Sequence, residues 1–217
     1  MARVAVLGGS FNPIHYGHLL LADDLLDQLA LDRVLFVPAG TPPHKPASLL
    51  ATAADRFEMV RRAIADHPRF DVSDVELRRD GVSYTVDTLT ALAAGGDELF
   101  YIVGSETFLD LLTWREPRKV AALARLVIIP RTGSVFDTEG AAAQKVLHEI
   151  GVEGGFVHAG GGAPPPRGVL IVHATSLPLS ASDLRRRVRE GRSLTYRVPP
   201  AVIEYVRAHG LYRVEPA

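Results

Sequence analysis

The sequence predicts an α/β fold built on a doubly wound parallel sheet. Apolar, β-branched runs typical of buried parallel strands recur along the chain, and stretches with the spacing of amphipathic helices separate them. Strands that alternate with helices form a parallel sheet with right-handed crossovers. The length of 217 residues suits a single domain, 1–217, in which we expect a core at 1–175 and a small helical C-terminal segment at 176–217.

The elements can be placed in order along the chain. In the helix after the first strand, His18 shares the apolar stripe of Ala22, so we expect His18 at the mouth of the core. A Gly- and Pro-rich stretch, 158–168, predicts a surface loop that acts as a spacer. The predicted strands are 3–7, 33–40, a short one at the start of 69–89, 98–104, 125–131 and 168–174. The predicted helices begin near residue 17, span 52–66, open near Thr85, and then span 181–190 and 199–209.

Composition limits the classes of function. Lys and Arg number 24 against 25 Asp and Glu, so no overall charge argues for a nucleic acid or a membrane as partner, and a bound anion needs a local site. The absence of cysteine excludes disulfides, thiolate metal ligands and a thiol nucleophile, and it fits a reducing compartment. The chain starts without the apolar stretch of a signal peptide and has no apolar run near about 18 residues, so we expect a cytoplasmic protein. The sequence leaves open whether the chain forms a homo-oligomer.

The turn after the first strand has the residues of an anion site. In an open parallel sheet, ligands bind beyond the carboxyl ends of the strands, where a glycine-rich turn and a helix N-terminus present N–H groups to phosphate. Gly8, Gly9 and Ser10 occupy that position. The stretch has neither the G-x-G-x-x-G spacing of dinucleotide-binding proteins nor the spacing of Walker A.

His15 and His18 narrow the chemistry further. Because they lie three residues apart at the entry to a helix, their rings can converge on one group. A zinc site would favour a spacing of four and a nearby carboxylate or cysteine, so we expect no metal bound by protein ligands here. Either histidine alone suits a structural role, whereas the pair suits hydrogen bonding to phosphoryl oxygens that gain charge in a transition state.

Five stretches then support a resemblance to a known family. "GGSFNPIHYGHL" at 8–19 is similar to the H-x-G-H signature of the nucleotidyltransferase superfamily, whose members have a Rossmann-like fold. Four more stretches resemble its bacterial nicotinate-nucleotide adenylyltransferase branch: "PPHK" at 42–45, "RRDGVSYTVDTL" at 78–89, "LLTWRE" at 111–116 and "LSASDLRRRVREG" at 179–191. The ending "YRVPPAVIEYVRAHGLY" is similar too, and the resemblance runs from residue 3 to 212 and thins only across 132–168.

The resemblance implies adenylyl transfer from ATP to nicotinate mononucleotide, giving deamido-NAD and pyrophosphate by direct in-line attack. Mg²⁺ would arrive with ATP, held mainly by phosphate oxygens and water. The implied catalytic residues are His15, His18, Lys45 and Arg185. The implied ATP-binding residues are Gly8, Gly9, Ser10, Phe11, His15, His18, His44, Lys45, Gly104, Glu106, Ser182 and Arg185. The implied residues for nicotinate mononucleotide are Tyr84, Thr85, Trp114 and Arg131.

Residues on the ATP side also have physical support of their own. Prolines stiffen "TPPHKP" and present His44 and Lys45, and Lys45 is one of only three lysines. A flexible point charge of this kind suits a moving triphosphate. Ser180 fits the N-cap of a helix whose first-turn amides, together with Ser182 and Arg185, suit an anion.

The pyridine side is supported in the same way. An aromatic face such as Trp114 stacks on a ring, and free amides at a helix start near Thr85 suit a carboxylate. Arg131, just past a strand end, can pair with a phosphate. Each of these residues also has a plain structural alternative, because a lone tryptophan is often packing and a lone arginine is often a surface residue.

Two positions depart from the family's pattern, and two other functions stay open. Glu106 stands where the family usually has an aspartate, so the carboxylate reaches further, and Ala181 lacks the hydroxyl of the family's Ser-Ser-Thr. Adenylyl transfer to another acceptor, such as phosphopantetheine, would share the histidines but lack the Ser-Tyr-Thr and tryptophan pair. A nucleotide-binding module or dehydrogenase without transfer chemistry is disfavoured by the missing G-x-G-x-x-G.

Overall fold

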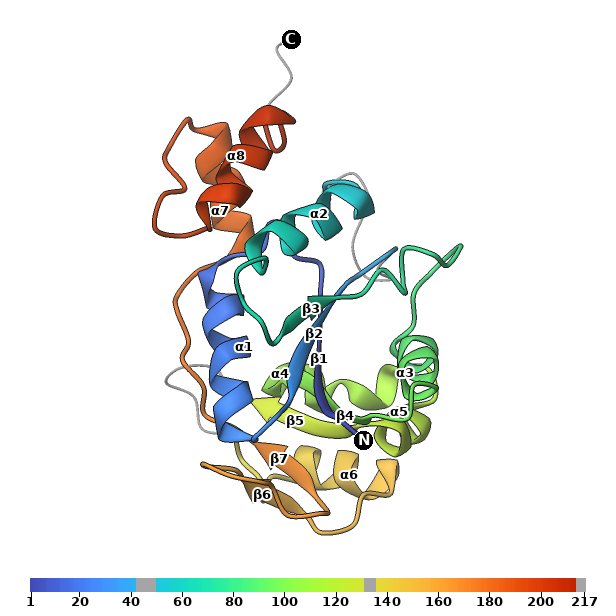
Figure 1. Cartoon of the computed structure of the whole chain (residues 1–217). Coiled ribbons are helices and arrows are strands. Elements are labelled where there is room, and N and C mark those ends of the chain that lie inside the picture. The colour runs from blue at the N-terminus through green and yellow to red at the C-terminus, as the bar shows by residue number, and fades with distance from the viewer. Residues whose placement is uncertain (42–49, 131–135, 214–217) are drawn as a thin grey trace.

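A computed structural model describes residues 1–41, 50–130 and 136–213 of the chain. Within these residues, a seven-stranded parallel sheet has the order β3-β2-β1-β4-β5-β7-β6 (Figure 1), which confirms the predicted doubly wound α/β fold. The strands are β1 (Arg3–Gly9), β2 (Arg33–Pro38), β3 (Phe70–Val72), β4 (Glu98–Gly104), β5 (Arg125–Ile129), β6 (Phe156–His158) and β7 (Val169–Ile171).

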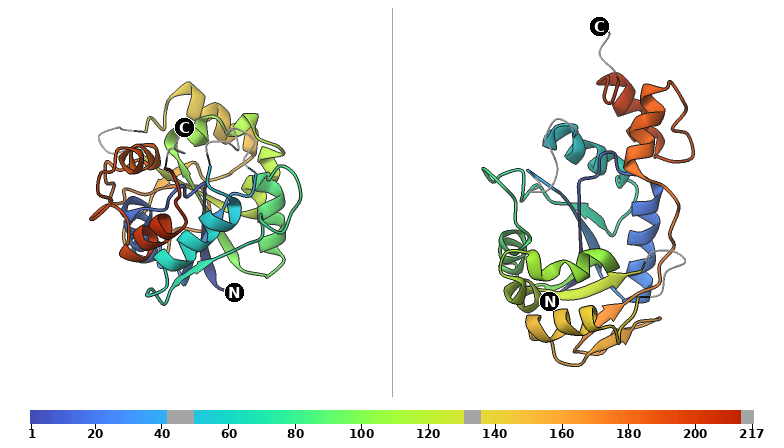
Figure 2. Two further views of the ribbon diagram at one scale, coloured as in Figure 1. Left: turned by 90° about the horizontal axis from the view of Figure 1, so that it is seen from above. Right: turned by 180° about the vertical axis from the view of Figure 1, so that it is seen from behind.

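Helices cover both faces of this sheet (Figures 1 and 2). On one face lie α1 (Tyr16–Gln28) and α2 (Ala53–Ala63), and α7 (Ala181–Arg189) and α8 (Pro200–Ala208) extend the same apolar cluster. On the other lie α3 (Thr85–Ala93), α4 (Ser105–Leu109), the 3₁₀ helix η2 (Leu111–Thr113), α5 (Pro117–Leu123) and α6 (Ala141–Ile150). None of the helices in the described part of the chain is long and apolar enough to cross a membrane.

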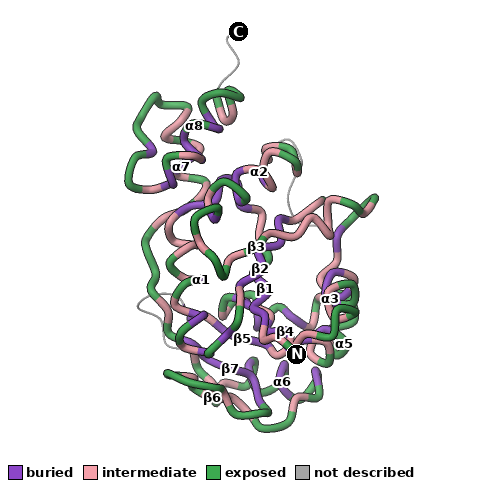
Figure 3. The backbone as a smooth tube through the Cα atoms, in the orientation of Figure 1, coloured by how far each residue is buried: buried purple, intermediate pink, exposed green. Residues whose placement is uncertain are grey.

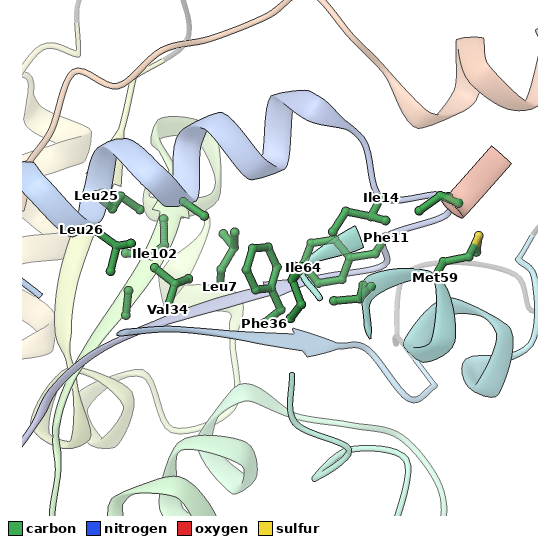
Figure 4. Close-up of a cluster of buried hydrophobic side chains, with 14 of the residues drawn as sticks. Leu7, Phe11, Ile14, Leu25, Leu26, Val34, Phe36, Met59, Ile64 and Ile102 are labelled. Carbon is green, nitrogen blue, oxygen red and sulfur yellow. The ribbon is translucent and has the colours of Figure 1, made fainter. Parts of the chain in front are cut away.

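The core consists of two apolar layers separated by the sheet. Alternate residues of β1 point to opposite faces, so Ala5 and Leu7 join the layer under α1, while Val4 and Val6 join the layer under α3. Figure 3 shows the resulting line of buried residues along the central strands. In the first layer, side chains of α1 pack on those of β1 and β2, and Phe11 and Met59 lie at one end of the cluster (Figure 4).

The structure corrects several element assignments between β4 and α7. The sequence predicts no element at α4, η2, α5, α6 or β6, and the strand predicted at 168–174 is longer than β7. Helix α4 and η2 are too short to show helical spacing, and β6 and β7 have three residues each. Helix α6 is different, because its buried residues do recur at helical spacing: Ala143, Val146, Leu147 and Ile150.

The Gly- and Pro-rich stretch after β6 forms a crossover without a helix. It connects the parallel neighbours β6 and β7, so it carries the chain back along the sheet edge. At its end, Gly168 has a φ of 95°, and a Cβ there would lie 2.9 Å from the carbonyl oxygen of Gly155. A side chain is therefore excluded where this connection enters β7.

The C-terminal helices lie beyond the carboxyl edge of the sheet, next to α2 (Figure 1). The hydroxyl of Tyr205 on α8 donates to the Asp55 carboxylate on α2 over 2.9 Å. Two more hydrogen bonds reach the turn between β1 and α1: Tyr212 donates to Asn12 Oδ1 over 2.8 Å, and Arg185 donates to the Asn12 carbonyl over 2.8 Å. The end of the chain therefore holds the turn that precedes the two histidines.

We expect Tyr212→Phe to lower the free energy of unfolding by about 1 kcal/mol, because the variant loses the hydrogen bond to buried Asn12. Urea denaturation measures this change. Tyr196→Phe is the matched control, because the Tyr196 side chain is 91% exposed. Equal stability of the two variants would contradict this account of the C-terminal contact.

Candidate active site

A pocket of about 410 Å³ opens where β1 and β2 end, beside β4. It joins the predicted phosphate turn to the predicted pyridine site, which are more than seventy residues apart in the chain. Its lining residues are Gly8, Gly9, Ser10, Val37, Ala39, Glu76, Ser83, Tyr84, Thr85, Tyr101, Thr113, Trp114 and Arg115.

The N-terminus of α3 supplies free donors to this pocket. Thr85 is the first helical residue, and the N–H groups of Asp87 and Thr88 both bond back to the Tyr84 carbonyl, over 3.1 and 3.2 Å. The N–H groups of Thr85 and Val86 have no acceptor within residues 1–41, 50–130 and 136–213. The first turn of α3, where Thr85 lines the pocket, therefore has two unsatisfied amides and the positive end of the helix dipole.

Aromatic residues line the same pocket. The rings of Tyr101 and Trp114 meet edge to face, with centroids 6.1 Å apart. The Tyr101 hydroxyl is 3.4 Å from Thr85 Oγ1, and burial raises its pKa to about 12, so the phenol stays neutral. The Arg115 guanidinium lies 5.1 Å from the centre of the Tyr84 ring. Aromatic side chains and the start of α3 therefore line one pocket.

The two histidines stack on each other at the start of α1. Their ring centroids are 3.7 Å apart with an interplanar angle of 19°, and the N–H of His15 donates to Nδ1 of His18 over 3.2 Å. The Phe11 ring meets His18 edge to face at 5.1 Å. A Cβ on Gly17 would lie 3.1 Å from His15 Nδ1, so the glycine between the histidines leaves room for the His15 ring. The two rings are thus neighbours, as their spacing predicts, and their convergence on one bound group stays a prediction.

Both histidines are neutral in the folded protein. Burial lowers the pKa of His15 to about 4, and burial together with repulsion from His15 lowers the pKa of His18 to about 3. Because His18 Nδ1 accepts a hydrogen bond, the single proton of its neutral ring is on Nε2. His18 is therefore a hydrogen-bond donor without a charge.

Helix α7 approaches the same turn from the C-terminal side. Ser180 Oγ accepts from the N–H of Asp183 over 3.2 Å, which confirms the predicted N-cap. Ser182 lies one residue inside the helix, with its hydroxyl 3.1 Å from that of Ser180. Arg185 reaches from the next turn of α7 to the Asn12 carbonyl. Of the residues predicted for the triphosphate side, Arg185 therefore contacts the loop that carries the histidines.

The remaining predicted residues divide into two groups. Gly104 ends β4 and caps α4, and Glu106 is exposed in the first turn of α4; neither lines the pocket. His44, Lys45 and Arg131 lie outside the described residues. In the part of the chain that is described, no three His, Cys, Asp or Glu side chains are grouped so that they could hold a metal ion.

Sequence reasoning did not single out several residues of the site. Tyr101 lies within a predicted buried strand, where it has the pattern of a core residue. Glu76 and Arg115 lie in turns with no distinctive spacing. Ser83 and Arg115 lie within the family-like stretches at 78–89 and 111–116, and that membership was the available signal.

Comparison with known proteins gives the class of this site. A family model described as cytidylyltransferase-like matches residues 6–187, so the fold and site are those of a nucleotidyltransferase. A "Probable nicotinate-nucleotide adenylyltransferase" from Synechococcus sp. (strain JA-3-3Ab) is 42% identical over 97% of this chain and 94% of its own. One from Thermomicrobium roseum is 40% identical over 100% of this chain and 94% of its own. The chain belongs to the nicotinate-nucleotide adenylyltransferase family.

Solved structures have the same fold. The nicotinic acid mononucleotide adenylyltransferase of Plasmodium falciparum, complexed with NaAD, superposes with a TM-score of 0.71, at 19% identity and over 98% of both chains. The same enzyme complexed with APC gives a TM-score of 0.68 at 18% identity. The Rossmann-like architecture expected from the sequence is therefore confirmed.

The lowered histidine pKa values predict a loss of stability in acid. The unfolded chain protonates both histidines below about pH 6.5, whereas the folded protein does so only near pH 4 for His15 and pH 3 for His18. Above pH 6.5 the two histidines are neutral in both states and do not destabilise the fold. Below that pH, each histidine lowers the free energy of unfolding by up to about 1.4 kcal/mol per pH unit. Urea denaturation between pH 7.5 and 4.5 measures this slope.

We expect His18→Asn to flatten that slope, because asparagine does not titrate and its side-chain oxygen can accept the His15 N–H in place of Nδ1. His148→Asn is the control, since the His148 side chain is 86% exposed. A slope that is equally steep in His18→Asn and in the unmodified protein would disprove burial of a neutral His18.

Proposed function

We propose that the protein transfers the adenylyl group of Mg-ATP to nicotinate mononucleotide, giving deamido-NAD and pyrophosphate. The observation that carries the proposal is the pocket in which the Gly8–Ser10 turn meets the α3 amides and Trp114. The names of the relatives, nicotinate-nucleotide adenylyltransferases, support the same acceptor.

The proposed step is a direct displacement. A 5′-phosphate oxygen of nicotinate mononucleotide forms a bond to the α-phosphorus of ATP, and the bond from that phosphorus to the oxygen bridging to the β-phosphorus breaks. Pyrophosphate leaves with the bonding electron pair. The attacking phosphate is already an anion, so no protein nucleophile and no covalent intermediate are required. The protein positions two anions in line and offsets the charge between them.

The residues on the ATP side then have distinct roles. His18 donates from neutral Nε2 to a phosphoryl oxygen, and His15 stacks on it and fixes its tautomer. Ser10 and the glycines before it present the turn to the phosphates. Arg185 and Ser182 act from α7. The sequence assigns His44 and Lys45 to the triphosphate as well, and Mg²⁺ arrives with ATP as part of that substrate.

On the other side, the nicotinate carboxylate binds the free amides at the start of α3. A carboxylate gains from the Thr85 and Val86 N–H groups and from the helix dipole. A carboxamide has no charge and turns an NH₂ donor toward these donors. Trp114 stacks on the ring of either form. This arrangement gives acid-over-amide selectivity without a dedicated cation.

Pyrophosphate release from Mg-ATP tests the proposal. The assay compares nicotinate mononucleotide, nicotinamide mononucleotide and phosphopantetheine as acceptors. We expect the first to react fastest. Equal use of the amide would overturn the nicotinate assignment, use of phosphopantetheine instead would support the rival acceptor, and no release with any acceptor would support nucleotide binding without transfer.

Two substitutions at His18 separate the two nitrogens of its ring. Asparagine retains an acceptor in place of Nδ1 and loses the Nε2 donor, whereas glutamine retains a donor near Nε2 and loses the acceptor. We expect His18→Asn to lower kcat by about 10²- to 10³-fold with little change in thermal midpoint. We expect His18→Gln to keep more activity and to lose more stability. The reverse order of the two kcat values would remove His18 from the donor role.

Selectivity for the acid is tested at the first residue of α3. Tyr84 is extended, with φ −104° and ψ 141°, so a proline at position 85 fits the backbone and removes one amide donor. We expect Thr85→Pro to reduce the acid-to-amide ratio of kcat/KM by about tenfold, because a charge-assisted hydrogen bond contributes roughly 1.5 to 3 kcal/mol. Thr85→Val keeps the amide and loses only the hydroxyl, so its ratio should stay nearly that of the unmodified protein. Equal ratios in the proline and valine variants would exclude the amide as the source of selectivity.

A further inference from the structure

Arg56 is a buried cation on the inner side of α2. Its side chain is 1% exposed, and among the described residues no other Asp, Glu, Lys or Arg side chain is buried to this extent. A guanidinium carries its charge at any physiological pH, so the interior holds a permanent cation here. Burying such a charge costs several kcal/mol unless its donors are satisfied.

The Arg56 donors are satisfied by carbonyl oxygens from three segments. Nη1 donates to Ser10 over 3.0 Å, Nη2 donates to Gly40 over 2.9 Å, and Nε donates to Ala51 over 3.1 Å. Ser10 belongs to the turn after β1, Gly40 follows β2, and Ala51 precedes α2. One planar side chain therefore fixes the spacing of three backbone segments.

A second set of hydrogen bonds continues from Gly40 to α3. The N–H of Gly40 donates to Glu76 Oε2 over 3.1 Å, and Glu76 Oε1 accepts from the Thr88 hydroxyl over 2.7 Å. A Cβ on Gly40 would lie 2.6 Å from the Glu76 carbonyl oxygen and 2.8 Å from Ser83 Oγ. Gly40 is thus held by a cation at its C=O and by a carboxylate at its N–H, in a space that admits no side chain.

The two ends of this network lie in the two halves of the proposed site. Ser10 lines the pocket on the phosphate side, and Thr88 lies one turn after Thr85, at the helix end that faces the pyridine side. Glu76 also lines the pocket. The hydrogen bonds from Ser10 through Arg56, Gly40 and Glu76 to Thr88 therefore connect the phosphate side of the pocket with α3.

We propose that Arg56 is a positioning residue that fixes the phosphate-binding turn relative to the start of α3 through Gly40 and Glu76. The identity of the two ligands rests on the proposed function. In-line transfer depends on the distance between two bound substrates, and a misplacement of about 1 Å can cost 10²-fold in rate. Arg56 would act on that distance without contacting either substrate.

Lysine cannot reproduce this arrangement, which makes Arg56→Lys the central variant. An ammonium keeps the charge but lacks the planar fork that reaches three carbonyls. We expect Arg56→Lys to lower kcat/KM for Mg-ATP and for nicotinate mononucleotide, each by between about tenfold and 10²-fold. Arg61→Lys is the matched control on the same helix, because the Arg61 side chain is 55% exposed and pairs with Glu58. Its kinetic constants should equal those of the unmodified protein.

Amide hydrogen exchange without substrates gives a readout that does not depend on activity. The N–H of Ala39 bonds to the Gly9 carbonyl, that of Gly40 to Glu76, and that of Ala51 to Asn12 Oδ1. We expect faster exchange of these three amides in Arg56→Lys and unchanged exchange in Arg61→Lys. Unchanged exchange in Arg56→Lys, or unchanged kcat/KM, would overturn the positioning role.

Thr88→Val tests the far end of the network and leaves the buried cation in place. The valine is isosteric and frees Glu76 Oε1. We expect faster exchange at Gly40 and, although Thr88 is on α3, a KM for Mg-ATP raised by about three- to tenfold. If Arg56→Lys does not fold, Thr88→Val alone tests the positioning role. An unchanged KM for Mg-ATP in Thr88→Val would then overturn the proposal. A protein that releases no pyrophosphate would instead refute the proposed function, and the exchange rates would still test the role of Arg56.

Discussion

The reversal of strand order between β1 and β4 determines where the site can lie. From β1 the chain adds β2 and β3 on one side, and from β4 it adds β5 on the other, so the connections after β1 and β4 leave toward opposite faces of the sheet. A crevice at the carboxyl edge results, and it accepts ligands in open parallel sheets. The Gly8–Ser10 turn and Gly104 lie on its two sides. The pocket, the stacked histidines and the α3 amides are all built around this one topological feature.

Much of this arrangement is encoded locally, and those parts could be predicted from the sequence. The N-cap at Ser180 and the start of α3 at Thr85 depend on the few residues around each helix start, and both are confirmed. The contact between His15 and His18 follows from their spacing on one turn. By contrast, β6 has only three residues and is stabilised by pairing with β7, so no local pattern marks it, whereas the apolar run at 168–174 predicts β7 and overestimates its length.

The residues that sequence reasoning missed share a dependence on distant segments. Arg56 lies on a helix where its type predicts exposure, and only the loops around Ser10 and Gly40 bury it. Tyr101 has the pattern of a core strand residue, and its place in the pocket depends on Trp114 and on the position of α3. Such roles become visible only when the tertiary structure brings the segments together, because neither the residue type nor its spacing differs from the ordinary case.

Near the β1–α1 turn, the histidines supply directed hydrogen bonds and the arginines supply positive charge. Burial keeps His15 and His18 neutral, so they offer directed donors but no positive charge to a phosphate. Among the described residues, two arginines that bind carbonyls of this turn supply positive charge, Arg56 from the interior and Arg185 from α7. Arginine does not titrate at physiological pH, so the positive potential behind the turn stays constant, whereas a charged histidine would lose its proton above about pH 6.5. In the proposed reaction, the electrostatic attraction of the two anionic substrates therefore does not depend on the histidines. Burial keeps the histidines neutral, and they act only as hydrogen-bonding groups.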